Sequence, residues 1–89
     1  MDHRRSETAI LAEILRYALE KPGITKVMYC ANLNHRAAGK YLNELQEKGL
    51  IEIVDQSPRK KFQTTPRGKV VLGRLEEALQ LIERREHDV

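Results

Sequence analysis

The sequence has 89 residues, a net charge of +3 and one cysteine, which suits a single domain with a thin hydrophobic core. A lone Cys30 excludes an internal disulfide framework and favours an intracellular protein. The apolar runs are too short to span a membrane, and the starting residues MDHRRSETAI lack the apolar stretch of a signal peptide. Charged residues alternate with regularly spaced apolar ones, which indicates a folded chain and not a disordered one.

The first predicted helix covers residues 6–20, where apolar residues recur at helical spacing. Ser6 is a suitable N-cap, because its hydroxyl can accept a hydrogen bond from the first turn. The helix is expected to end at the KPG sequence that follows, since Pro22 disfavours helical backbone at the residue before it. Ile24 is then expected to make a single short strand pairing.

Two further helices are predicted, one short and one longer. The short helix covers residues 25–31 with Thr25 as its N-cap, and it is followed by a tight connection. The longer helix covers residues 35–48, with Asn34 as N-cap and Gly49 as a left-handed C-cap.

Polar groups are concentrated at the front of the helix over residues 35–48. Its apolar face includes Tyr41, which we expect in the core together with Leu33 and Tyr29 of the preceding segment, and Cys30 is expected to be structural. A helix that only packs would not need so many long polar side chains at its start. The polar face comprises His35, Arg36, Gly39, Lys40 and Asn43.

A β-hairpin with a basic tip is predicted after this helix. Residues 50–55 alternate and are β-branched, and a turn with Pro58 leads to a return strand that begins at residue 61. Residues 21–43 carry four basic and no acidic residues, and residues 55–69 carry five basic and one acidic residue, so each block has a net charge of +4. The two blocks either form one basic face or remain separate solvated loops.

The last predicted helix runs from Pro66 to about Glu86, with Thr65 as N-cap and proline at its first position. The pattern predicts a short coiled-coil seam of Leu72, Leu75, Leu79 and Ile82, at spacings of three, four and three, flanked by Val71, Ala78 and Leu81. The seam either joins two copies of the chain or packs against the first helix. The candidate dimer residues are Val71, Leu72, Leu75, Ala78, Leu79 and Ile82.

The order of these elements predicts a mostly α fold with a small β-hairpin, a winged helix-turn-helix over residues 1–65 and a dimerisation helix over residues 66–89. In such a fold the second helix of the motif enters the DNA major groove, so Arg36 suits guanine and Asn43 suits adenine. Lys26 suits a phosphate at the start of the preceding helix. The predicted DNA-binding residues are Lys26, Asn34, His35, Arg36, Gly39, Lys40, Asn43, Arg59, Lys60 and Lys61.

The sequence also resembles a known family. The stretch TKVMYCANLNHRAAGKYLNELQEKGLIEI, followed by a short hairpin and TTPRGKVVL, is similar to the small archaeal winged-helix DNA-binding proteins of about ten kilodaltons. The resemblance covers roughly residues 8–82. It implies a homodimer formed by an antiparallel coiled coil of the last helices, double-stranded DNA as partner and a cytoplasmic, nucleoid-associated location. The last helix is shorter than in the chromatin-associated members, which favours a local transcription regulator.

Several other functions are disfavoured by the residue pattern. No nucleophile–base pair, paired-carboxylate site or phosphate-binding glycine loop is present, so we expect no enzyme and no cofactor. His3, His35, His87 and Cys30 lack metal-ligand spacing, so we expect no metal, and no small-molecule ligand is evident. The alternative function is a winged-helix module that binds protein instead of DNA. Acidic or apolar groups over residues 34–43 would favour this alternative, but the residues there are polar and basic.

Overall fold

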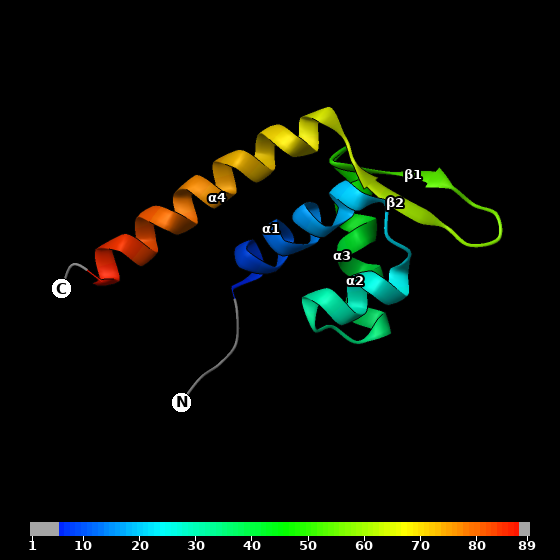
Figure 1. Cartoon of the computed structure of the whole chain (residues 1–89), viewed down its shortest axis with the longest axis horizontal. Coiled ribbons are helices and arrows are strands. Elements are labelled where there is room, and N and C mark those ends of the chain that lie inside the picture. The colour runs from blue at the N-terminus through cyan, green and yellow to red at the C-terminus, as the bar shows by residue number, and fades with distance from the viewer. Residues whose placement is uncertain (1–5, 88–89) are drawn as a thin grey trace.

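Three helices, a β-hairpin and a long C-terminal helix make up the computed structural model of the chain, which describes residues 6–87, with side chains as far as Ile82 (Figure 1). The elements are α1 (Glu7–Tyr17), a 3₁₀ turn η1 (Ala18–Glu20), α2 (Ile24–Ala31), α3 (His35–Glu47), β1 (Ile51–Asp55), β2 (Lys61–Thr64) and α4 (Pro66–His87). The predicted fold class and element order are therefore confirmed. No helix of the described residues has both the length and the apolar character needed to cross a membrane.

The predicted first helix is present as α1 plus the 3₁₀ turn η1. The hydroxyl of Ser6 accepts a hydrogen bond from the Ala9 N–H at 3.0 Å, so the predicted N-cap is confirmed. The helix ends because Lys21 takes a left-handed conformation, with φ of 58°.

Two expectations for the following segment are wrong. Ile24 is the first residue of α2 and not a strand residue, and Gly23 stands at the N-cap position that was expected for Thr25. Gly23 has extended backbone, with φ of −82° and ψ of 176°, so the helix starts one residue earlier. The single strand-like pairing is made by Pro22 instead, whose carbonyl accepts the N–H of Phe62 at 2.9 Å. Proline has a carbonyl but no N–H, so it can pair only in this one-sided way.

A tight turn joins α2 to α3. Asn32 is left-handed with φ of 56°, a conformation that asparagine tolerates better than most residues. Leu33 is half-buried against the core, less covered than expected. The side-chain oxygen of Asn34 accepts the Ala37 N–H at 2.8 Å, which confirms the N-cap of α3.

The hairpin follows directly from the end of α3. Gly49 has a φ of 73°, as expected for the left-handed C-cap, and the Leu50 N–H reaches back to the Leu45 carbonyl at 2.9 Å. Strands β1 and β2 pair antiparallel, with Ile53 opposite Phe62 and a register shift between Ile53 and Asp55. The tip between the strands is exposed along its whole length.

Helix α4 is anchored to the hairpin by its N-cap. The hydroxyl of Thr65 accepts the N–H of Gly68 at 2.9 Å and donates to the Gly49 carbonyl at 2.7 Å, and Pro66 is the first helical residue. Both sequence-based signals for this helix start are confirmed. A single hydroxyl thus ties the start of α4 to the end of α3.

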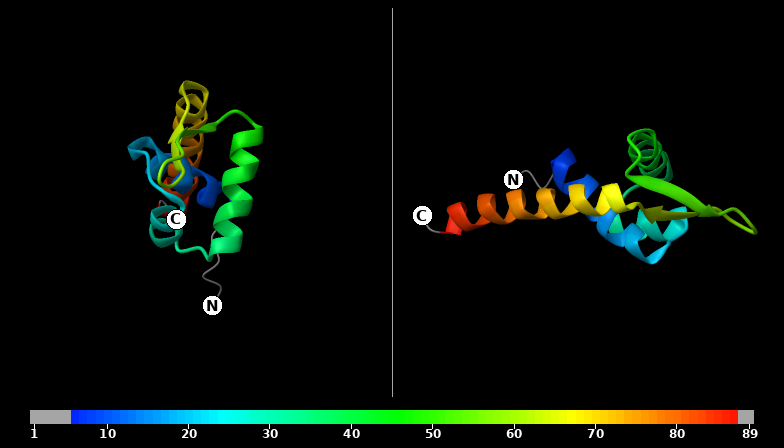
Figure 2. Two further views of the ribbon diagram at one scale, coloured as in Figure 1. Left: turned by 90° about the vertical axis from the view of Figure 1, so that its right-hand side faces the viewer. Right: turned by 90° about the horizontal axis from the view of Figure 1, so that it is seen from above.

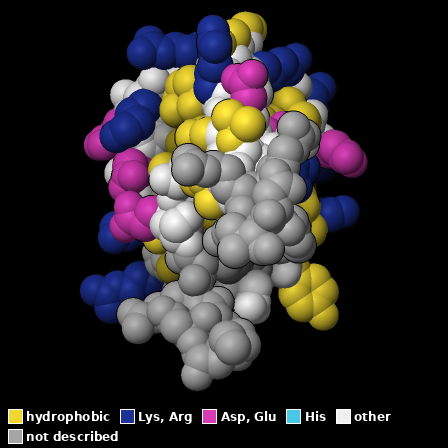
Figure 3. All heavy atoms as spheres, turned by 90° about the vertical axis from the view of Figure 1, so that its left-hand side faces the viewer, with side chains coloured by type: hydrophobic (Ala, Val, Ile, Leu, Met, Phe, Trp, Pro, Cys, Tyr) yellow, Lys and Arg dark blue, Asp and Glu magenta, His cyan; other side chains and the backbone are white. Residues whose placement is uncertain are grey.

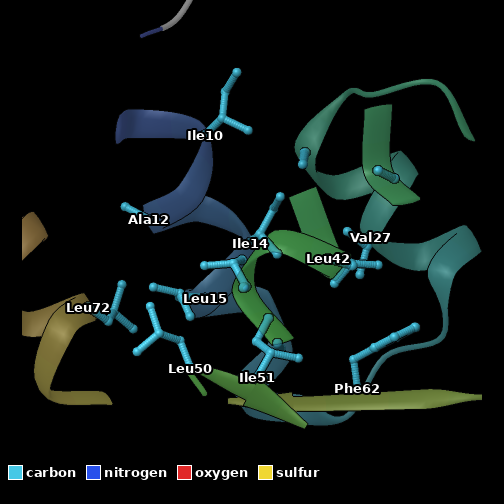
Figure 4. Close-up of a cluster of buried hydrophobic side chains, with 14 residues drawn as sticks. Ile10, Ala12, Ile14, Leu15, Val27, Leu42, Leu50, Ile51, Phe62 and Leu72 are labelled. Carbon is cyan, nitrogen blue, oxygen red and sulfur yellow. The ribbon is translucent and has the colours of Figure 1, made fainter. Parts of the chain in front are cut away.

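The hydrophobic core lies between α1, α2, α3 and the hairpin, and its most buried large side chains are Ile14, Leu15, Val27, Leu42 and Leu45. Helix α4 closes one side of this core, where Leu72 points toward Leu15 and Leu50 (Figure 4). The buried hydroxyl of Thr64 donates to the Leu15 carbonyl at 2.6 Å, so the hairpin is hydrogen-bonded to α1.

Candidate nucleic-acid interface

A groove of about 1040 Å³ opens between α2, α3 and the hairpin. Viewed toward the hairpin, α3 forms one side, while α2 and the hairpin lie on the other (Figure 2, left). The hairpin residues in the lining are Arg59, Lys60, Lys61 and Phe62, and the α2 side contributes Gly23, Ile24, Thr25, Lys26, Tyr29 and Cys30. The structure therefore brings the predicted Lys26 and the predicted wing cations to one concavity.

Helix α3 forms the wall of the groove with one stripe of residues. His35, Gly39, Asn43 and Gln46 recur at spacings of four, four and three, so they lie along one side of the helix. Leu42 lies beneath them at the edge of the core. We name these four residues the groove stripe; three of them were predicted from the sequence, and Gln46 was not.

Arg36 and Lys40 lie outside the groove lining, on the side of α3 that faces solvent. Helical geometry places them roughly opposite the buried Ala38 and Leu42, and both are exposed. The Lys40 ammonium lies 5.9 Å from the centre of the Tyr41 ring. The side-chain oxygen of Asn34 accepts the helix-capping hydrogen bond. Its side-chain amide N–H groups are therefore the donors that can contact a ligand.

The charge of the groove has one sign. Its lining contains four basic residues, Lys26, Arg59, Lys60 and Lys61, and no acidic residue. One lysine of the first basic block, Lys26, therefore lies in the same groove as three cations of the second block. Such a surface attracts a polyanion and concentrates it at the groove.

Two residues of α2 lie where the sequence did not place them. Tyr29 was expected in the core, but its side chain is 91% exposed and lines the groove. The core side of α2 is formed by Val27 and Ala31, and a residue two positions after Val27 is rotated about 200° away from it. Cys30 is half-buried and also lines the groove, whereas Tyr41 packs against the core as expected.

The six candidate dimer residues fall into two rows on α4. The inner row is Leu72, which is only 6% exposed, and Leu79, which is half-buried against the protomer's own core. Val71 and Leu75 are half-buried against the same core, so much of the predicted seam packs within the protomer, which was the alternative to a dimer seam. The outer row follows the spacing four, three, four of a coiled-coil seam, and its coverage falls from half-buried to exposed along the helix. The outer row is Val71, Leu75, Ala78 and Ile82.

Apolar surface remains open on this part of the molecule. Ile82 is 56% exposed and Leu81 is 55% exposed. Figure 3, which looks at the end toward which α4 points, shows hydrophobic side chains exposed between charged ones. An exposed ion pair also joins α4 to α1, where the Arg16 guanidinium contacts the Glu76 carboxylate at 2.6 Å and 2.7 Å.

Metal ligands do not cluster in the described part of the chain, where no three His, Cys, Asp or Glu side chains come together. His3 and the side chain of His87 lie outside the described residues.

Comparison with known proteins gives consistent matches over nearly the whole chain. A winged helix-turn-helix family profile matches residues 4–83. An uncharacterised protein of the archaeon Methanocaldococcus jannaschii is 32% identical over 81 residues, which cover 90% of this chain and 79% of that protein. The crystal structure of Sso10a-2, a DNA-binding protein from Sulfolobus solfataricus, is 33% identical with a TM-score of 0.85, over 94% of this chain and 88% of that one.

More distant structures share the fold alone. MepR, a transcription regulator of the Staphylococcus aureus multidrug efflux pump MepA, is 17% identical with a TM-score of 0.74. The match covers 89% of this chain, but this chain spans only 62% of MepR.

Proposed function

This chain belongs to the winged helix-turn-helix family, and we propose that it binds double-stranded DNA as a homodimer, acting as a transcription regulator or chromatin-associated protein in the cytoplasm, at the nucleoid. The observation that carries the proposal is the groove, whose lining joins α3 to four cations and contains no acidic residue. The similarity to Sso10a-2, which is described as a DNA-binding protein, supports it.

In this proposal α3 enters the major groove with its exposed side. Arg36 has the fork geometry that reads guanine, and Asn43, the member of the groove stripe that lies nearest to the solvent side of the helix, reads adenine. Lys40 and the amide of Asn34 contact the flanking phosphates, and Gly39 carries no side chain that would hold the helix away from the duplex. His35 lies at the start of the same stripe, as a phosphate or base neighbour.

The hairpin and α2 hold the backbone on either side of the groove. Arg59, Lys60 and Lys61 contact phosphates beyond the major groove, and Lys26 contacts one at the start of α2. These contacts are independent of base sequence, so they set the strength and salt dependence of binding more than its selectivity.

The dimer is proposed to form through the outer row of α4, in an antiparallel coiled coil. Residues 1–65 then act as the DNA-reading part and residues 66–89 as the dimerisation part. Val71, Leu75, Ala78 and Ile82 meet their counterparts in the partner, while Leu72 and Leu79 mainly complete the core of their own protomer.

Fluorescence anisotropy with labelled duplex DNA at several salt concentrations tests DNA binding. A dimer with six to eight phosphate contacts gives a log–log salt slope of about −5 to −7. Replacing Lys60 and Lys61 by Ala removes up to four contacts per dimer and flattens the slope by up to about 3.6. Replacing Lys69 and Arg74 by Ala is the matched control, because both are exposed on α4, lie outside the groove lining and carry the same charge.

The outcomes of this experiment separate the two functions under consideration. A wild-type slope near zero would rule out DNA binding and leave the protein-binding module as the function. Equal loss of slope in both double variants would show that only net charge matters and not the groove. Comparing random sequence with the gene's own upstream region then distinguishes a selective regulator from a general chromatin protein.

A further inference from the structure

Tyr29 is the most exposed large hydrophobic side chain of the described residues, at 91%. A single exposed aromatic residue is common on protein surfaces and by itself indicates nothing. Two facts set Tyr29 apart: it belongs to the lining of the groove, and it lies one helical turn after Lys26 on the same side of α2. Its ring and hydroxyl therefore stand beside a cation in a concavity without acidic residues.

The lining of the groove is not wholly polar. Besides the ring of Tyr29 it includes the half-buried Ile24 and the largely buried Leu42 and Phe62, while the cations come from Lys26 and from the hairpin. A ligand suited to this site combines negative charge along its edges with apolar surface between the charges. The sugar–phosphate backbone of a nucleic-acid strand has this chemistry, because apolar deoxyribose carbons alternate with phosphates.

We propose that Tyr29 is a DNA-contacting residue, whose ring packs on a deoxyribose of the strand in the groove and whose hydroxyl donates to a phosphate oxygen. Tyrosine suits this role because one side chain combines an apolar ring with a hydrogen-bonding tip. The contact is neutral, so it strengthens binding without releasing a counterion. This inference rests on the proposed function, since it assigns a further residue to the same interface.

The test compares Tyr29→Phe and Tyr29→Ala with wild type by fluorescence anisotropy over a range of salt concentrations. Losing the hydroxyl should weaken binding about 2- to 10-fold, and losing the ring as well should weaken it further, each at an unchanged salt slope. Lys26→Ala is the charged comparison, because it should weaken binding and also flatten the slope by about 0.9 per contact. Exposure of Tyr29 means that neither substitution should alter the circular dichroism spectrum.

A direct spectroscopic reading is available because the chain has three tyrosines and no tryptophan. Tyr17 and Tyr41 are half-buried against the core, so replacing both by Phe leaves Tyr29 as the only fluorophore. Duplex DNA should then change the Tyr29 emission after correction for absorption by DNA. A matched variant that retains only Tyr41, with Tyr17 and Tyr29 replaced by Phe, should respond much less.

The results distinguish this inference from the proposed function. Wild-type affinity in Tyr29→Ala, or unchanged Tyr29 emission at saturating DNA, would overturn the role of Tyr29 while DNA binding itself stands. A flattened salt slope in Tyr29→Phe would also overturn it, because a neutral contact cannot change the count of released ions. Absence of binding by the wild-type protein would instead refute the proposed function.

Discussion

Substitution of Ile82 by Glu tests the proposed dimer without disturbing the protomer. Ile82 belongs to the outer row and is 56% exposed, so within the protomer a charged side chain can remain in water. Leu79→Glu is less informative, because Leu79 packs against the protomer's own core and its loss affects folding as well as association. Leu81→Glu is the matched control, since Leu81 is 55% exposed and lies about 100° around the helix.

The expected effect follows from the exposed part of Ile82. Full burial of such a side chain contributes about 1.5–3 kcal/mol, so burying the exposed half contributes about 1–1.5 kcal/mol per copy. Placing a carboxylate in an apolar seam costs about 1–3 kcal/mol more per copy. Two copies therefore remove about 4 kcal/mol or more of association free energy, which raises the dissociation constant about 1000-fold.

Sedimentation equilibrium at micromolar concentrations measures this change. Ile82→Glu should be monomeric and bind DNA weakly, while Leu81→Glu, at a flanking position of the kind that coiled coils commonly fill with Glu, should remain dimeric. A monomeric wild type, or a dimer that persists in Ile82→Glu, would refute the seam. Dissociation by Leu81→Glu alone would place the partner on the other side of α4.

Three further outcomes are expected. Gly68→Ala should lower the free energy of unfolding by about 1–3 kcal/mol in thermal melts, because its Cβ would collide with the Leu50 carbonyl, whereas Gly73→Ala should stabilise the chain by up to about 1 kcal/mol since nothing lies within 4 Å. Cys30→Ala should keep DNA affinity within a few-fold; loss of binding with the fold intact would reveal a redox or metal role for the thiol. Arg36→Ala should cost about 1–3 kcal/mol on a preferred site and less on random DNA, and equal losses on both would assign Arg36 to phosphate instead.

The ends of several helices could be predicted from local sequence signals. Ser6, Asn34 and Thr65 each cap a helix with a side-chain oxygen, and Gly49 takes the left-handed conformation that ends α3. Each of these roles depends on residue type and on neighbours within three positions. The start of α2 was misplaced for a related reason. Gly23 is the N-cap but has no side chain that could indicate a cap, whereas Thr25 has a hydroxyl typical of N-cap residues.

Which residues line the groove depends on tertiary structure and was harder to predict. Tyr29 lies on a helix of eight residues, too short for periodicity to separate its buried side from its exposed one. Gln46 lies three residues after Asn43 on the same side of α3, so extending the predicted polar face by one helical turn would have found it. The positive charge was visible in the sequence, whereas the place of Ile24, Leu42 and Phe62 in the groove lining was not predicted.

In the proposed dimer, helix α4 would link the stability of each protomer to the spacing of the two DNA-reading parts. Leu72 and the half-buried Leu75 and Leu79 pack α4 against its own domain, so α3 keeps a set position relative to the outer row. The helix has 22 residues and is therefore about 33 Å long, close to the 34–36 Å between half-sites one DNA turn apart. In the proposed dimer, a slip of one heptad along the seam would move the domains by about 10 Å and take both recognition helices out of phase with the grooves. In the proposed dimer, the inner row would therefore hold α4 on its own domain, and the outer row would set the register in which two protomers read one face of the duplex.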